Sequence, residues 1–80
     1  MKFLQVLKYK QSVKRDGVLY KEYALYSSDE FVATVVQKTE DENIHLVLWY
    51  GGDRHGKSDL TEGGMDGLMD FVASKLNSNK

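Results

Sequence analysis

Apolar and polar residues alternate along the first third of the chain, which is the period of a half-buried β-strand. The segments Lys2 to Val13 and Val18 to Ser27 are rich in Val, Tyr and Phe, and Arg15-Asp16-Gly17 lies between them. Asp-Gly between two such runs is a strong signal for a two-residue hairpin turn. The pattern therefore predicts two antiparallel strands joined by a tight turn.

The rest of the chain predicts two more strands, a loop and a helix. The strands are the apolar runs Phe31 to Lys38 and Ile44 to Tyr50, with the acidic turn 40–43 between them. Residues 51–64 are glycine-rich and predict a loop. Apolar residues then recur at helical spacing through about Asn77, at Met65, Leu68, Met69, Val72 and Leu76. We expect a single domain, 1–80, with an α+β fold: a four-stranded antiparallel sheet and one C-terminal helix packed on one face (ββββα).

A two-residue turn also fixes which side chains of the first hairpin share a face, because it places Arg15 opposite Val18. Counting from the turn assigns one face to the core under the helix, with Phe3, Leu7, Tyr9, Val13, Tyr20, Ala24 and Tyr26 on it. The same count places four lysines around an aromatic ring on the opposite, open face, with Lys8, Lys10, Lys14 and Lys21 near Tyr23, Leu19 and Leu25.

The open lysine face predicts a site for single-stranded nucleic acid. Lysines supply point charges for phosphates, and an exposed ring offers a surface on which unpaired bases stack. The predicted nucleic-acid-binding residues are Lys8, Lys10, Lys14, Lys21 and Tyr23. The alternative is structural, since antiparallel sheets commonly show one polar face to water and lysine there blocks edge-to-edge aggregation.

Charge is distributed unevenly, although the net charge of the 80 residues is only -1. Residues 1–21 carry six lysines and arginines against one acid, and residues 22–80 carry five against eleven. This asymmetry favours an anionic partner for the basic part. The absence of cysteine, of a signal-peptide core and of a membrane-length apolar run leads us to expect a cytoplasmic protein with no membrane partner.

Residues 51–58 read GGDRHGKS, which satisfies the phosphate-loop pattern G-x-x-x-x-G-K-S/T after an apolar run. In nucleotide hydrolases of this type the helix starts at the lysine, so that its N–H groups meet the phosphates. Here Gly63, Gly64 and Gly67 place the helix start further along the chain. We interpret the match as fortuitous and keep a weaker candidate, an anion-binding loop formed by Arg54, Gly56, Lys57 and Ser58.

Other chemistry is sparse. His45 falls in a strand and His55 in the loop, without the three or four converging ligands that a metal site requires. Asp53, His55 and Ser58 are residue types of a hydrolytic triad, but they crowd one loop with nothing to fix their geometry. We therefore expect no metal, no cofactor and no enzymatic activity.

The run Ile44 to Tyr50, IHLVLWY, is apolar on both faces, which suits a strand covered on both sides. Either this strand lies inside the sheet beside the first strand, or a second molecule covers its other face, or the helix and the loop cover both sides. In the second case Trp49 and Tyr50 are the expected interface anchors, since large aromatic residues dominate interface energetics. A homodimer is one such arrangement.

The ββββα order resembles that of the positive cofactor 4-like single-stranded DNA-binding proteins. The passage through Trp49, Gly56, Lys57, Leu60, Thr61 and Leu68 is similar to their passage from strand to helix. The resemblance implies a dimer whose curved sheet carries basic and aromatic residues.

Two functions are compatible with the sequence. The first is a small non-enzymatic binding module that contacts an anionic partner, such as single-stranded nucleic acid, through a basic sheet face. The alternative is a small protein that binds, and in some cases inhibits, another protein, as mobile-element and phage proteins do.

Overall fold

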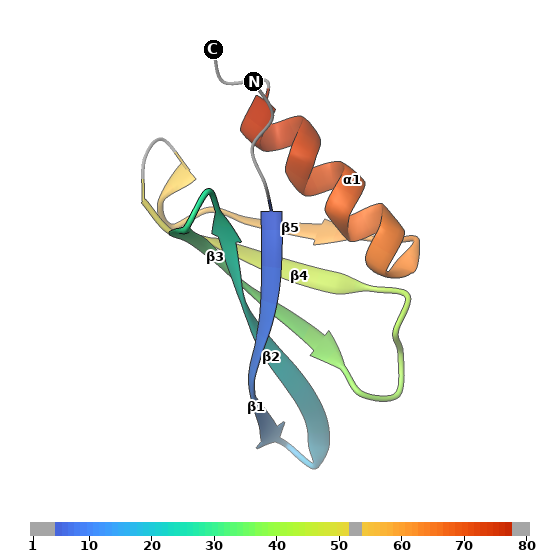
Figure 1. Cartoon of the computed structure of the whole chain (residues 1–80). Helices are drawn as coiled ribbons and strands as arrows, with labels where there is room; N and C mark the ends of the chain where they lie inside the picture. Colours follow the sequence, from blue (N-terminus) through green and yellow to red (C-terminus); the bar gives the residue numbers. More distant parts are fainter. Residues whose placement is uncertain (1–4, 52–53, 78–80) are drawn as a thin grey trace.

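One antiparallel sheet with a helix on one side makes up the part of the chain that the structure describes (Figure 1). The structure is a computed structural model and describes residues 5–51 and 54–77. The sheet has five strands in the order β1-β2-β3-β4-β5, so each strand pairs with its neighbour in the chain. The elements are β1 (Gln5–Arg15), β2 (Val18–Ser27), β3 (Glu30–Lys38), β4 (His45–Trp49), β5 (Ser58–Thr61) and α1 (Gly64–Asn77). The α+β fold with a C-terminal helix is confirmed.

The fifth strand was not expected. Residues 51–64 were predicted to be a loop throughout, but Ser58–Thr61 pairs with β4 in antiparallel fashion. Four residues are too few to show an alternating pattern, and β5 exists because the adjacent strand supplies its hydrogen-bonding partners. β4 consequently lies inside the sheet, between β3 and β5 and not beside β1.

The first hairpin turns where the sequence predicts it, and then departs from the predicted register. Asp16 and Gly17 both adopt positive φ, at 52° and 82°, as a two-residue turn of this kind requires, and Arg15 pairs with Val18. Between Tyr9 and Gln11 the register shifts by one residue, so that Lys10 is an unpaired bulge. A bulge of one residue moves every side chain beyond it to the other face.

The bulge divides the predicted core face, because the assignment holds for Leu7 and Tyr9 and fails for the other described residues. Leu7 pairs with Leu25 and Tyr9 pairs with Tyr23, and these residues lie on the side of the sheet that α1 covers, here called the helix face. The assignment of Val13, Tyr20, Ala24 and Tyr26 to this core was wrong, because they lie on the opposite side, here called the open face. Phe3 lies outside the described residues.

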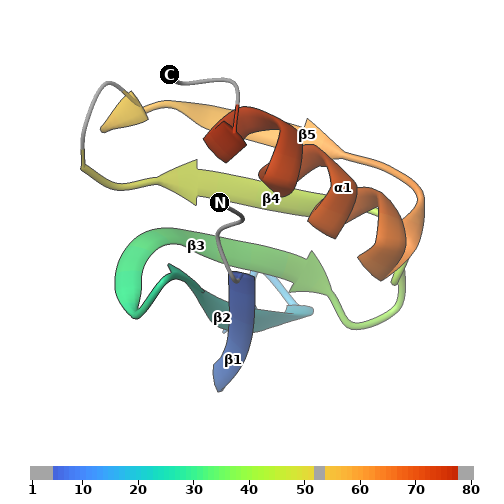
Figure 2. The same cartoon turned by 45° about the horizontal axis from the view of Figure 1, so that its top comes forward.

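The core lies between the helix face and α1. Its fully or almost fully buried members are Leu25, Ala33, Val35, Val47 and Trp49 from the sheet and Leu68 and Val72 from the helix. Burial of one large aliphatic side chain contributes about 1.5–3 kcal/mol. In Figure 2 the helix lies across β4 and β5. No helix in the described part of the chain is both long and apolar enough to cross a membrane.

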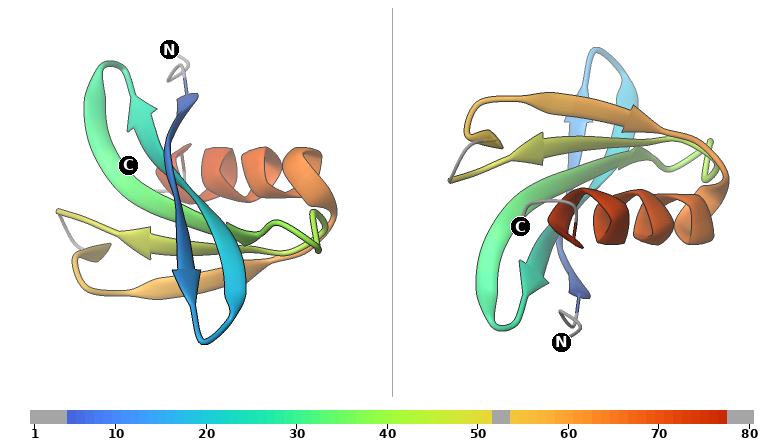
Figure 3. Two further views of the ribbon diagram at one scale, coloured as in Figure 1. Left: turned by 90° about the horizontal axis from the view of Figure 1, so that it is seen from below. Right: turned by 90° about the horizontal axis from the view of Figure 1, so that it is seen from above.

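The hairpin end bends away from the helix. Figure 3 shows, from below and from above, α1 and the turn between β1 and β2 lying on opposite sides of β4 and β5. The outer half of β1 and β2 therefore forms a wall beside the open face, and α1 leaves that face uncovered.

The start of α1 approaches the end of β5 very closely. The N–H groups of Gly63 and Gly64 donate to the side-chain oxygen and the backbone carbonyl of Asn43, at 3.2 and 2.9 Å, and hold the first turn against the β3–β4 loop. A Cβ atom on Gly67 would meet the backbone carbonyl of Glu62 well inside van der Waals contact. This position therefore excludes any side chain.

A buried polar cluster lies at one end of the core. His45 is completely buried, and its Nε2 atom lies 2.9 Å from the side-chain nitrogen of Gln37. That Gln37 nitrogen also donates to the carbonyl of Glu42, at 3.3 Å. An amide nitrogen can only donate, so it faces the His45 ring as a donor, while the Nδ1 atom of His45 is buried without a hydrogen-bond partner in the described chain. Burial lowers the pKa of His45 from its usual 6.5.

We expect Gly67→Ala to destabilise the protein, although alanine normally stabilises a helix interior by about 1 kcal/mol relative to glycine. The added methyl group must displace the Glu62 backbone, which typically costs about 1–3 kcal/mol. Urea unfolding followed by circular dichroism measures the difference, with Ser74→Ala at an exposed position of the same helix as the control. A Gly67→Ala protein as stable as the wild type would contradict this close approach.

We also expect stability to fall below about pH 6.5. The unfolded chain takes up a proton on His45 near the ordinary pKa, whereas the folded protein resists protonation until lower pH. The free energy of unfolding then decreases by at most about 1.4 kcal/mol per pH unit as pH falls between the two values. Urea unfolding of wild type and His45→Gln at about pH 7.5 and 5.5 tests this. An equal pH response in the two proteins would refute the role of His45.

Candidate nucleic-acid interface

The open face carries large apolar side chains that nothing in the described chain covers. Leu60 is 65% exposed and Leu48 is 40% exposed, although both lie on strands of the sheet. Single exposed apolar residues are normal, but a contiguous exposed group marks a contact surface. The face divides into an aromatic end and an aliphatic end.

The aromatic end is a row of four rings, here called the aromatic row, formed by Tyr26, Phe31, Tyr50 and His55. Ring centroids lie 5.9 Å apart between Tyr26 and Phe31, and 5.4 Å apart at each of the two following steps. Adjacent ring planes are inclined at 67°, 48° and 67°. Tyr50, in the middle of the row, is 59% exposed.

Positive charge lies beside the row. The ammonium group of Lys8 lies 5.2 Å from the centroid of the Tyr26 ring. Lys10, at the bulge, reaches Glu22 at 3.8 Å, so this acid is offset by a neighbouring base. The hollows on the rest of this face are lined by the further charged residues Arg15, Lys38 and Asp41.

The structure does not gather the predicted lysine site on one face. Lys8 pairs with Ala24 on the open face, whereas Lys14 and Lys21 pair with Leu19 and Ser12 on the helix face. Tyr23 is partly buried on the helix face, where its ring meets that of Tyr9 edge-on at 5.8 Å. The bulge at Lys10 is the physical reason, because β1 residues before and after it follow different registers against β2.

The loop after β4 uses its own backbone amides. Gly56 donates to the carbonyl of Trp49 at 3.2 Å, and Lys57 donates to the carbonyl of Arg54 at 3.0 Å. These two N–H groups of the candidate anion-binding loop are therefore already engaged within the protein. The basic side chains of Arg54 and Lys57 are the part of the candidate that these hydrogen bonds leave unchanged. Ser58 begins β5, so the GGDRHGKS segment joins two antiparallel strands and does not open a helix.

Of the two predicted interface anchors, one is in the core. Trp49 is only 5% exposed, its indole N–H donates to the Asp59 carboxylate at 2.7 Å, and the Arg54 guanidinium lies 5.6 Å from its ring centroid. It is therefore unavailable as an anchor in the folded chain. Tyr50 is exposed and remains a candidate.

Within residues 5–51 and 54–77, no three His, Asp or Glu side chains gather closely enough to hold a metal ion. Comparison with known protein families, curated proteins and solved structures gives no match to this chain.

Sequence reasoning missed Tyr26 and Phe31, which it placed in the core and in a strand without a role. Tyr26 and Phe31 pair across the β2–β3 turn, where the register shifts between Leu25 and Tyr26. A visible signal was the pair of aromatic residues that flank Ser27-Ser28-Asp29-Glu30. This aromatic pair does not predict a site by itself, because the sequence does not tell on which face of the sheet each ring lies.

We expect Asp59→Ala to lower the free energy of unfolding by about 1–3 kcal/mol, because it leaves the buried indole N–H of Trp49 without a partner. Trp49 is the only tryptophan, so its fluorescence reports this site directly. Acrylamide should quench the folded wild type weakly. Strong quenching in the folded wild type would contradict the burial of Trp49. For the free energy of unfolding, Asp66→Ala on the exposed helix surface is the control.

Proposed function

We propose that the protein is a non-enzymatic binding module that holds single-stranded nucleic acid on the aromatic end of its open face. The observation that supports this most is the continuous row from Lys8 through Tyr26, Phe31 and Tyr50 to His55. Lys8 supplies charge for a phosphate, and the rings supply surfaces for bases.

Aromatic rings favour an unpaired strand over a duplex. In a duplex the flat surfaces of the bases are covered by their neighbours, whereas an unpaired base can place its π-face against a protein ring. Each such contact contributes about 1–3 kcal/mol and depends little on which base is present. We therefore expect weak sequence preference, and Tyr50, as the most exposed tyrosine of the row, is the strongest candidate contact.

The near-neutral net charge does not oppose this proposal, because much of the acid lies elsewhere. Asp66 and Asp70 belong to α1, which lies on the helix face, and Asp59 accepts from Trp49 on that same face. Of the charged residues placed beside the aromatic row, Lys8 and Lys10 outnumber Glu22, the acid that Lys10 contacts. The modest excess of charge predicts binding that is detectable chiefly at low salt.

We expect Tyr50→Ala to weaken binding of a labelled single strand by about 5- to 150-fold, the equivalent of about 1–3 kcal/mol. Fluorescence anisotropy measures the affinity, with a labelled duplex as comparison. Tyr9→Ala is the matched control, because Tyr9 is 57% exposed but lies on the helix face. If neither the labelled single strand nor the labelled duplex binds at low salt, the proposed site is wrong. It is also wrong if Tyr50→Ala and Tyr9→Ala lose affinity equally.

The same titration separates the two faces by charge. Lys8→Ser and Lys14→Ser remove the same charge from opposite faces of β1. If Lys8 contacts one phosphate, its loss should reduce the slope of log affinity against log salt by about 0.7, whereas loss of Lys14 should leave the slope unchanged. A response to Lys14→Ser alone would move the site to the helix face.

A further inference from the structure

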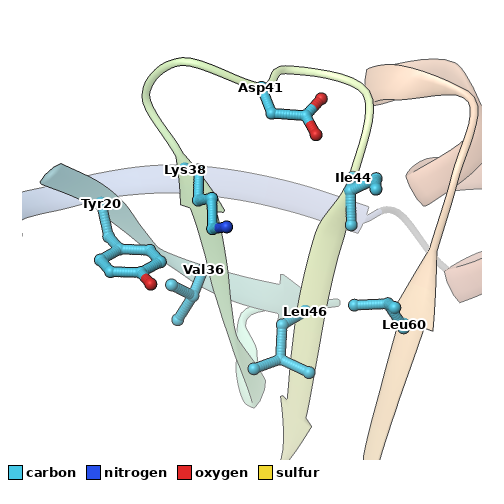
Figure 4. Close-up of a pocket in the computed structure, with 7 residues that line it drawn as sticks. All are labelled: Tyr20, Val36, Lys38, Asp41, Ile44, Leu46 and Leu60. Atoms are coloured by element: carbon cyan, nitrogen blue, oxygen red, sulfur yellow. The ribbon is translucent and has the colours of Figure 1, made fainter. Parts of the chain in front are cut away.

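The aliphatic end of the open face forms a second surface, here called the aliphatic band, made of Val13, Tyr20, Val36, Leu46, Leu48 and Leu60. Two adjoining hollows of about 220 and 420 Å3 lie over it and share Tyr20, Val36 and Leu46 in their linings. Figure 4 shows the smaller hollow, with Tyr20 and Leu60 on either side of Val36 and Leu46. The band thus reaches from the first hairpin to β5.

We propose that a second copy of this chain covers the aliphatic band and makes a homodimer. Leu60 is a projecting apolar side chain at one edge of the band, and the hollow beside Val13 and Tyr20 lies at the other edge. In the proposed dimer, a two-fold axis through the band places Leu60 of each copy against the hollow of its partner. Such self-complementary contacts are the basis of most dimers of identical chains.

The charges around the band also fit a second copy better than other occupants. Its described rim carries Arg15 and Lys38 together with Glu22 and Asp41, two bases and two acids. A balanced rim does not repel its own copy, and opposite charges at a rim help to set the orientation of the partner. The same acids disfavour an anionic polymer, and the band offers bases a single ring, that of Tyr20, among five aliphatic side chains.

The dimer does not depend on the proposed nucleic-acid function. The aliphatic band and the aromatic row share no residue. A dimer contact over the band therefore does not require Tyr26, Phe31 or Tyr50. The oligomeric state is measured without any nucleic acid. Either proposal can therefore fail while the other stands.

The test is the molar mass of the full chain by sedimentation equilibrium, from micromolar to near-millimolar concentration. We expect the wild type to approach twice the chain mass of 9.1 kDa as concentration rises. Leu60→Lys should raise the dissociation constant of the dimer by at least about tenfold, since it places an unpaired charge in an apolar contact. Leu48→Lys should act in the same way.

Leu19→Lys is the matched control. Leu19 is an apolar strand residue with 43% exposure, comparable to the 40% of Leu48, but it lies on the helix face. This variant should dimerise like the wild type, and circular dichroism should show that all three variants are folded. A wild type that is monomeric at every concentration would falsify the proposal. A dimer that is unaffected by Leu48→Lys and Leu60→Lys overturns it too, because the contact then lies elsewhere.

Discussion

One 14-residue helix has to cover a sheet of five strands, and it can cover only one side. A small domain buries a limited fraction of its surface, and here α1 covers the helix face alone. Leu25, Val35 and Val47 are completely buried beneath Leu68 and Val72. The open face receives no comparable cover from the described chain, yet it keeps large apolar and aromatic side chains. Both proposed contacts, one for unpaired bases and one for a second copy, arise from this imbalance.

Two register shifts decide which side chains each face of the sheet carries. The bulge at Lys10 moves Leu7 and Tyr9 onto the helix face beside Leu25 and Tyr23. A second register shift, between Leu25 and Tyr26, places Phe31 beside Tyr26 on the open face. Bulges reorient side chains without leaving a distinctive composition in the sequence, so neither was predictable. The five residues chosen as one lysine site are for that reason divided between two faces, and the aromatic row was found only in the structure.

Strong local signals made the larger elements predictable. The Asp16-Gly17 turn, the long strands and the helix ending at Asn77 follow from turn chemistry and hydrophobic period, which depend on near neighbours. β5 was missed because Ser58–Thr61 has no period of its own and is ordered by β4. Trp49 was a candidate interface anchor because both faces of its strand are apolar, but apolar character alone does not tell which face α1 covers. Tertiary context, and not residue type, sets both outcomes.

The strand order carries a consequence for how the chain reaches its fold. Because every strand pairs with the next one along the chain, the sheet can be assembled from successive hairpins, with small loop-closure costs at each step. α1 is the exception, since Leu68 and Val72 must pack with Leu25, more than forty residues earlier in the chain. Until that contact forms, both faces of the sheet are exposed to water. Docking of the last element is therefore the step that turns a row of local hairpins into one cooperative unit.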